Sequence, residues 1–103
     1  MEKAHITEAE SEILAALWRR GPLPFVSLIE EVQERQTWAS ATIKTLLSRL
    51  MHKDLVTSER SEGRQLYHPQ LTREAYVAGE VQALVDRLFG GDRGALKALL
   101  DTP

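Results

Sequence analysis

The apolar residues of this chain change their spacing near residue 55, and this change restricts the possible folds more than any other feature of the sequence. Before it, they recur every three or four residues, which is typical of helices with one buried face. Between residues 55 and 69, two short β-prone runs, LVTSE and QLYHP, flank the polar turn RSEGR. This pattern predicts a two-stranded hairpin. After residue 70 the helical spacing returns.

Start and stop signals divide the first part of the chain into three helices. Thr7 and Glu10 form a capping-box pair at the start of the first helix, and Gly21-Pro22 ends it. Pro24 fits the entrance of the second helix, where the N–H group that proline lacks is not needed. Ser40 or a neighbouring residue is the expected N-cap of the third. Three short helices followed by a hairpin is the element order of a winged helix.

Two further helices are predicted after the hairpin. The segment LTREAYVAGEVQALVDRLFG has helical spacing, Gly90-Gly91 stops it, and RGALKALLD forms a short final helix. The sequence therefore predicts a mainly helical protein with one small β-hairpin. We expect a winged helix-turn-helix domain over residues 1–70 and a helical segment over residues 71–103.

The predicted third helix has two faces of different character. At 100° per residue, the apolar residues Ile43, Leu46, Leu47 and Leu50 share one side, as a core face requires. The opposite side carries Ala41, Thr45, Ser48 and His52, with Lys44 and Arg49 on its flanks. Small residues let a backbone approach base edges, hydroxyl and methyl groups contact bases, and flanking cations reach phosphates. A solvated face that happens to lack acids is the alternative interpretation.

Charge is distributed unevenly along the chain. The formal net charge of −2 does not by itself indicate a nucleic-acid partner. Residues 36–69 contain 5 Lys and Arg against 3 Asp and Glu, whereas residues 1–35 contain 4 against 7 and residues 70–103 contain 4 against 5. Because a Debye length of about 8–10 Å screens distant acids at physiological salt, local charge matters more than the total. The segment with the third helix and the hairpin is therefore suited to an anionic partner.

Composition argues against several other classes of protein. The chain has no cysteine, so a disulfide framework and thiolate metal sites are excluded. It has no apolar run of about 18 residues and no signal-peptide pattern, so we expect no membrane span and a cytoplasmic location. The three histidines lack metal-ligand spacing, and no nucleophile or phosphate-loop motif is present. We therefore expect no enzyme activity, no metal and no cofactor.

Four segments of the sequence resemble the penicillinase-repressor family of bacterial regulators (the BlaI, MecI and CopY type). That family has a third helix of the pattern W-S-x-x-T-[IV]-x-T-L-L-x-R-L and a wing of the pattern G-R-x…Y-x-P, which TWASATIKTLLSRLMHKDLV and EGRQLYHP resemble. ITEAESEILAALWRRGP resembles its first helix, and VQALVDRLFGGDRGALKALL resembles its dimerisation segment. The resemblance covers about residues 5–100.

The resemblance implies a sequence-specific transcriptional repressor that binds double-stranded DNA as a homodimer on a palindromic operator. The third helix would lie in the major groove and the hairpin wing on the backbone. Thr42 and Thr45 would meet bases or nearby phosphates, and Arg64 would contact phosphate or the minor groove. The expected DNA-binding residues are Trp38, Ser40, Ala41, Thr42, Lys44, Thr45, Arg49 and Arg64.

A second apolar stripe lies on the long helix predicted after the hairpin, beyond the core that three helices and a hairpin can close. An isolated helix does not keep so much apolar surface in water, so we expect pairing with a second copy of the chain. Core packing within one chain is the alternative for such a stripe. The expected dimer-interface residues are Tyr76, Val77, Val81, Leu84, Val85, Leu88, Phe89, Leu96, Leu99 and Leu100.

The resemblance also implies a sensor or protease that relieves repression. Some branches of the family are cleaved at an Asn-Phe bond where this chain has Ala98-Leu99, and the copper-sensing branch uses cysteines that this chain lacks. The alternative function is a winged-helix protein–protein interaction module with little DNA affinity. The acidic net charge favours it, as do Ala39 and Ala41, which replace a common serine and a common basic residue.

Overall fold

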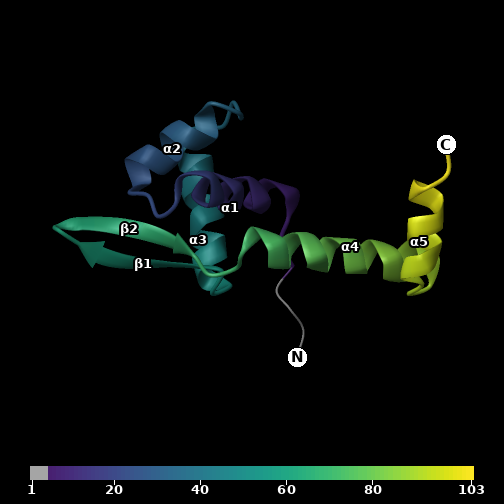
Figure 1. The fold of residues 1–103 in the computed structure, drawn as a ribbon. Helices are drawn as coiled ribbons and strands as arrows, with labels where there is room; N and C mark the ends of the chain where they lie inside the picture. The colour runs from purple at the N-terminus through teal and green to yellow at the C-terminus, as the bar shows by residue number, and fades with distance from the viewer. Residues whose placement is uncertain (1–4) are drawn as a thin grey trace. The chain divides into compact units, whose positions relative to one another are not determined.

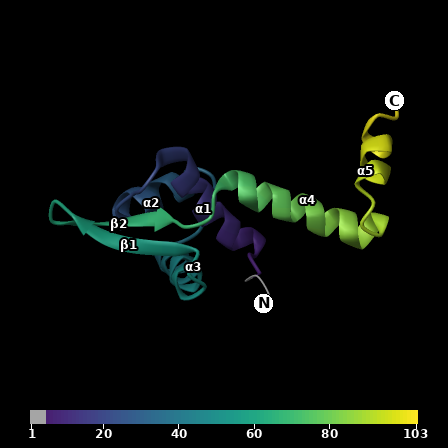
Figure 2. The ribbon, with the colours of Figure 1, turned by 60° about the horizontal axis from the view of Figure 1, so that its bottom comes forward.

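The computed structural model describes residues 5–103 and confirms a mainly helical fold with one antiparallel hairpin (Figure 1 and Figure 2). The elements are α1 (Glu8–Arg20), α2 (Phe25–Gln33), α3 (Ser40–His52), β1 (Val56–Ser61), β2 (Arg64–Pro69), α4 (Arg73–Phe89) and α5 (Arg93–Leu100). The chain divides into a first compact unit that ends at Thr72 and a second one, Arg73–Pro103. The expected domain boundary, after residue 70, lies close to this division. The first four residues of that expected domain lie outside the described residues.

The limits of α1 follow from local hydrogen bonds, as the sequence predicts. The hydroxyl of Thr7 accepts a hydrogen bond from the Glu10 N–H at 3.1 Å, and the Thr7 N–H donates to Glu10 Oε1 at 3.0 Å. This capping box satisfies two N–H groups that the helix leaves free. Gly21 ends α1 with a φ of 81°, a conformation that L side chains rarely adopt.

Helix α3 begins without a side-chain cap. Its N-cap is Ala39, the neighbour of Ser40, which is the first residue of the helix. An alanine side chain cannot accept a hydrogen bond, so no cap covers the first N–H groups. At the other end the chain leaves the helix through Asp54, which has a φ of 62°, and the Leu55 N–H donates to the Leu50 carbonyl at 2.9 Å.

The hairpin turn is shorter than the sequence analysis predicts. The strands pair from Val56↔Pro69 to Ser61↔Arg64, so only Glu62 and Gly63 form the turn. The prediction of a turn over residues 60–64 is wrong in length. Both turn residues have positive φ, 52° and 78°, as a two-residue type I′ turn requires, and its twist matches that of the strands. The strands therefore continue directly up to the Glu62-Gly63 pair on both sides.

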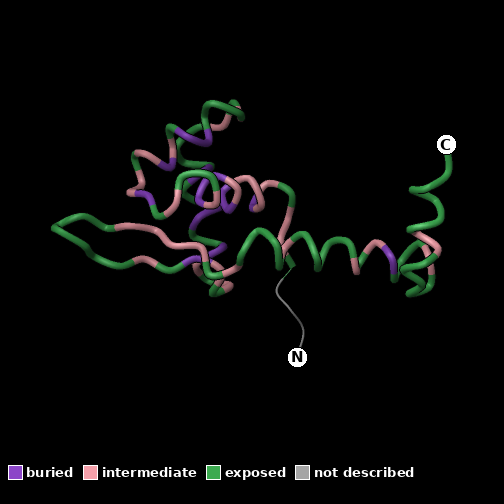
Figure 3. Tube along the Cα trace, viewed as in Figure 1, coloured by how far each residue is buried: buried purple, intermediate pink, exposed green. Residues whose placement is uncertain are grey.

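One continuous core fills the first unit. Its buried side chains come from all three helices, the segment before α2 and the start of β1 (purple in Figure 3). They include the predicted core face of α3, which is confirmed. The core residues are Ile13, Leu14, Ala16, Leu17, Leu23, Leu28, Val32, Ile43, Leu46, Leu47, Leu50 and Val56. Leu23 also pairs with Tyr67 of β2 through backbone hydrogen bonds of 2.9 and 3.3 Å, which holds the base of the hairpin against the helices.

The second unit is a corner of two helices. Gly90 and Gly91, with φ of 57° and 85°, end α4 as predicted. The Gly91 N–H donates to the Val85 carbonyl at 3.1 Å, and the side chain of Val85 is fully buried. Arg93 at the start of α5 donates two hydrogen bonds to Gln82 Oε1 of α4, at 2.9 and 2.6 Å. These contacts hold the two helices together within this unit.

Candidate nucleic-acid interface

The face of α3 opposite its leucines is open to solvent. Ile43 and Leu50 are fully buried, whereas the residues on the opposite side of the helix are exposed. The predicted division of the helix into a core face and a free face is therefore confirmed. The exposed residues are Ser40, Ala41, Thr42, Lys44, Thr45, Ser48, Arg49 and His52. These include all the predicted binding residues of this helix.

The free face of α3 carries positive charge and no acid. Residues 36–53 contain no Asp or Glu, and within the described residues neither Lys44 nor Arg49 takes part in an ion pair. A shallow depression lies over the C-terminal half of this face. It is lined by Lys44, Thr45, Ser48, Arg49, His52 and Lys53. All six belong to two rows at i, i+4 spacing, so an anion placed here would meet cations and hydroxyl groups together.

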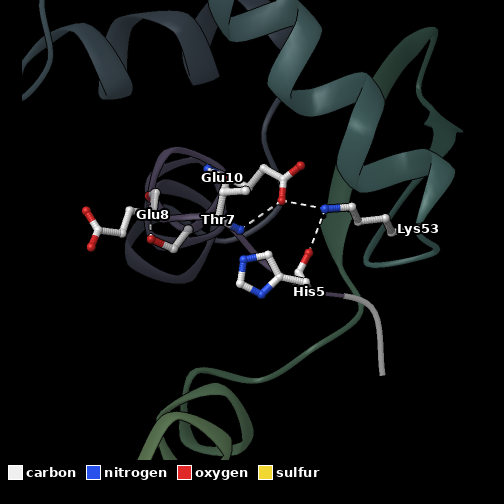
Figure 4. Close-up of polar contacts among 6 residues, drawn as sticks. His5, Thr7, Glu8, Glu10 and Lys53 are labelled. Carbon is white, nitrogen blue, oxygen red and sulfur yellow. Dashed lines mark hydrogen bonds and ion pairs between the residues drawn. The ribbon is translucent and has the colours of Figure 1, made fainter. Parts of the chain in front are cut away.

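Lys53 is the cation of this depression that the sequence analysis misses, and it is already paired. Its Nζ donates to Glu10 Oε1 at 2.7 Å and to the carbonyl oxygen of His5 at 2.6 Å (Figure 4). The interaction joins the end of α3 to the start of α1, 43 residues apart in the chain. No signal in the sequence within a few residues of either partner marks this pairing. Lys44 and Arg49 are therefore the cations of the face that remain available.

The carboxylate of Glu10 is stabilised in its charged form. Burial by itself raises the pKa of Glu10, but hydrogen bonds from Lys53 and from the backbone of Thr7 outweigh burial and lower the pKa below its ordinary value. Glu10 is 1% exposed. Because its pKa is lowered, Glu10 stays an anion at neutral pH and neutralises Lys53.

A second buried carboxylate belongs to the scaffold and not to the α3 face. Glu31 of α2 accepts hydrogen bonds from Arg19 Nε at 2.8 Å and Arg20 Nη1 at 3.0 Å, at the end of α1. These bonds lower the pKa of Glu31 despite its burial. These two ion pairs join the end of α1 to the C-terminal half of α2, so the two helices that support α3 are themselves held together.

The two threonines of the α3 face use their hydroxyl groups differently. Thr45 Oγ1 donates a hydrogen bond to the carbonyl oxygen of Ala41 at 3.0 Å. The hydroxyl of Thr42 makes no hydrogen bond within the described residues. Thr42 is therefore free to donate to a ligand, whereas the proton of Thr45 is already engaged. Sequence alone does not distinguish the two residues.

Trp38 lies at the start of α3 and packs against the core. Its side chain is partly buried, and its carbonyl oxygen accepts a hydrogen bond from Gln33 Nε2 at 3.0 Å. Trp38 thus fixes the loop that leads from α2 into α3. The sequence pattern predicts only a DNA contact for Trp38, which stays a prediction, and does not indicate this packing.

The hairpin presents two arginines near its tip. Arg64 opens β2 directly after the turn and is exposed, as a wing residue must be. Arg60 is also exposed, and the sequence analysis missed it because it placed this residue inside the turn. Arg60 pairs with Gln65 and Arg64 with Ser61, so the arginines lie on opposite faces of the hairpin. The alternation of side chains around a two-residue Glu62-Gly63 turn could have revealed this.

Histidines and membrane spans give no further site. His5 meets Lys53 Nζ through its backbone carbonyl oxygen, and Nε2 of His68 lies 3.6 Å from Glu59 Oε1 across the hairpin. Among residues 5–103, no three His, Cys, Asp or Glu side chains are grouped so that they could hold a metal ion. None of the helices described is both long and apolar enough to cross a membrane.

The residues expected to form a dimer interface differ in exposure. Val85 is fully buried inside its own chain, so its side chain is not available to a second copy. Tyr76, Leu84, Phe89 and Leu96 are partly buried. Five remain well exposed: Val77, Val81, Leu88, Leu99 and Leu100. The sequence stripe did not distinguish these groups, because burial of Val85 depends on how α4 and α5 meet.

Three helices followed by a hairpin, with one face of the third helix open to solvent, define a protein of the winged-helix class. Residues 6–101 match the penicillinase repressor family. The chain therefore belongs to the penicillinase repressor family, as the sequence resemblance indicates.

A relative named penicillinase repressor agrees with this assignment. An uncharacterised 16.5 kDa protein of Latilactobacillus sakei is 31% identical over 93% of this chain and 66% of its own length. The penicillinase repressor of Bacillus licheniformis is 28% identical over 84% of this chain and 67% of its own length. The chain thus spans about two thirds of each of these relatives.

A solved structure shares the fold of the winged helix. The solution structure of monomeric BlaI of Bacillus licheniformis, in complex with the blaP half-operator, is similar with a TM-score of 0.65. The similarity covers 73% of this chain and 92% of that one, at 25% identity.

Proposed function

We propose that this chain is a sequence-specific DNA-binding transcriptional repressor that acts as a homodimer on a palindromic operator. The observation that carries the proposal is the free face of α3, which combines small and hydroxyl-bearing residues, no acid, and a Lys44 and an Arg49 that form no ion pair within residues 5–103. The relatives named penicillinase repressor and the BlaI half-operator complex support it. They do not favour the alternative of a protein–protein interaction module.

Helix α3 has the form that the major groove of DNA accepts. The groove of B-DNA is about 12 Å wide and admits an α-helix whose exposed side chains are small. Ala41, Thr42 and Thr45 would approach base edges, while Lys44 and Arg49 would reach phosphates on either side. The first turn of α3 has no side-chain cap, so its N–H groups can also meet a phosphate.

The hairpin would act as a wing on the DNA backbone. Arg64 is exposed and has no ion pair within the described residues. A guanidinium group in this position suits a phosphate contact, which fixes orientation without reading sequence. We therefore assign Arg64 a contribution to affinity for all duplexes and Thr42 a contribution to specificity.

The second unit would hold two copies together. Leu88, Leu99 and Leu100 are 57%, 60% and 72% exposed, and Val77 and Val81 are each 40% exposed. Burying these side chains against a second copy removes apolar surface from water. A two-fold dimer carries two copies of α3 related by symmetry, which suits a palindrome. A sensor or protease that relieves repression and a cytoplasmic location also stay predictions.

The test begins with selection of duplexes from a randomised library and from genomic fragments. The enriched duplex should bind saturably in a mobility-shift titration, with an affinity that falls steeply as salt rises. Thr42→Ala should reduce the preference for this duplex over random DNA by about 1–3 kcal/mol. Arg64→Ala should weaken both duplexes alike and reduce the salt slope by about one.

Two results would contradict the proposal. One is the absence of enrichment even at about 50 mM salt, where phosphate contacts are strongest. The other is equal loss on the enriched and random duplexes for Thr42→Ala, which would remove base reading from α3. Glu30→Gln, an exposed substitution on α2, is a control that should change neither affinity.

A further inference from the structure

The hydrogen bond made by Thr45 determines which part of this side chain a ligand can use. Its Oγ1 donates to the carbonyl oxygen of Ala41 at 3.0 Å, although both residues are exposed. A threonine hydroxyl has one proton, so Thr45 cannot donate to a base while this bond persists. The γ-methyl group, in contrast, is not engaged in any polar interaction.

Ala41 and Thr45 together form an apolar spot on a polar face. Residues four apart lie one above the other on a helix, so the methyl groups of these two side chains are neighbours. Lys44 and Arg49 flank them, and no acid is present in residues 36–53. In the major groove, the C5-methyl group of thymine is the one apolar group on a base edge that such a spot can meet.

We infer that Ala41 and Thr45 form a methyl-reading pair that contacts the C5-methyl group of a thymine in each operator half-site. The inference rests on the proposed function, since it needs α3 in the major groove. Thr45 is then a specificity-determining residue that acts through its methyl group and not through its hydroxyl. It favours a T·A pair at one position, because the other bases carry no methyl group there.

Two matched substitutions separate the methyl group from the hydroxyl. Thr45→Val keeps the methyl group and removes the hydroxyl, whereas Thr45→Ser keeps the hydroxyl and removes the methyl group. The probe is the duplex that the wild-type protein enriches from a randomised library. It is compared with the same duplex in which each thymine in turn is replaced by deoxyuridine, which lacks only the C5-methyl group. Fluorescence anisotropy measures each affinity.

We expect one thymine per half-site at which deoxyuridine weakens wild-type binding about fourfold, the effect of losing one buried methylene-sized contact. Thr45→Val should bind the unmodified duplex as tightly as wild type and stay sensitive to that replacement. Thr45→Ser should bind about fourfold more weakly and lose the sensitivity. The loss of affinity caused by Thr45→Ser and the loss caused by deoxyuridine at that thymine should thus be strongly non-additive, as expected for groups in contact.

Thr102 supplies the matched control. Its Oγ1 donates to the carbonyl oxygen of Ala98 at 2.9 Å, so it makes the same hydrogen bond to the residue four positions earlier, two residues after the end of α5. Thr102→Val and Thr102→Ser should leave the affinities for the unmodified duplex and for the deoxyuridine-containing duplex unchanged. Circular dichroism of the Thr45 variants checks that their helix content equals that of wild type.

The outcomes separate the inference from the proposed function. If no duplex is enriched, the proposed function fails. If a duplex is bound but no thymine is sensitive to deoxyuridine, the methyl-reading pair is overturned while the repressor proposal stands. The same holds if Thr45→Val is the weaker variant, because the hydroxyl would then be the group that accepts a hydrogen bond from adenine or cytosine.

Discussion

The two units of this chain are built from amphipathic helices of similar character, but they bury their apolar residues to very different extents. In the first unit, twelve buried apolar residues from three helices, a loop and a strand form one core. In the second unit, Arg73–Pro103, Val85 is the single fully buried apolar side chain, and five large apolar side chains are exposed. The same spacing of apolar residues thus leads to a closed core in one unit and an open surface in the other.

The reason lies in how many elements surround each stripe. A helix buries one face only against something else, and three helices with a hairpin base enclose a common interior. Two helices that meet at a corner cover only the residues at the corner, which here means Val85. The open stripe on the second unit is therefore surface that a second copy of the chain can cover, whereas the first unit needs no such cover.

The largest expected effect separates the two units directly. Leu50→Ala removes a fully buried side chain of the first unit and should lower the free energy of unfolding by about 2–5 kcal/mol. Leu99→Ala, at 60% exposure in the second unit, should change it by less than about 0.5 kcal/mol. Urea unfolding at low protein concentration measures both. Equal costs would mean that the second unit is also a closed core.

Acid should weaken the first unit through its two buried carboxylates. Glu10 and Glu31 have a lowered pKa in the folded chain, relative to an ordinary value of 4.5. Their stabilisation is therefore complete above about pH 4.5 and is lost as the pH falls through the folded pKa. Glu10→Gln should remove its share of this dependence and cost about 1.5–3 kcal/mol at neutral pH, since Lys53 loses its charged partner.

Chemical unfolding over a series of pH values measures this effect, and Glu30→Gln serves as the control. Glu30 is exposed, so its substitution should leave both the stability at neutral pH and its decrease in acid nearly unchanged. A wild-type stability that does not fall below pH 4.5 would contradict the assignment of the two carboxylates.

Dimerisation tests what the open stripe is for. Leu88→Ala and Leu100→Ala should each weaken self-association by about 1–2 kcal/mol per protomer, because apolar groups leave the proposed interface. Val26→Ala is the matched control: Val26 is 67% exposed on α2 of the first unit, outside the proposed interface. Sedimentation equilibrium measures the dimer constant. A wild-type chain that stays monomeric at high concentration would show that the stripe has another role.

One type of substitution should have opposite effects in the two units. Gly63 has a φ of 78° in the hairpin turn, so Gly63→Ala should destabilise by about 1–2 kcal/mol. Gly79 lies within α4 with open space around the position of a Cβ, so Gly79→Ala should stabilise by about 0.5–1 kcal/mol. Thermal unfolding measures both changes. Effects of the same sign would contradict the assignment of either the turn or the helix.

The candidate interface shows how much of a site can be predicted from sequence. The exposure of Thr42 and Thr45 follows from helical spacing, because their positions are set relative to buried leucines of the same helix. The place of Arg60 on a strand was missed because the turn was predicted too long. The packing of Trp38 was missed, since it depends on elements that meet in three dimensions. The pairing of Lys53 with Glu10 was missed for the same reason.

The sequence by itself determined the order of the elements, the start of α1 at the Thr7–Glu10 capping box, the stops at Gly21 and Gly90-Gly91, and the core face of α3. Each of these depends on interactions between residues a few positions apart, which the chain encodes locally. Only the tertiary structure decided that Val85 is buried while Leu88 is exposed, and that Glu10 holds Lys53 from 43 residues away. Such contacts arise from the angles and distances at which helices pack, and no short stretch of sequence contains them.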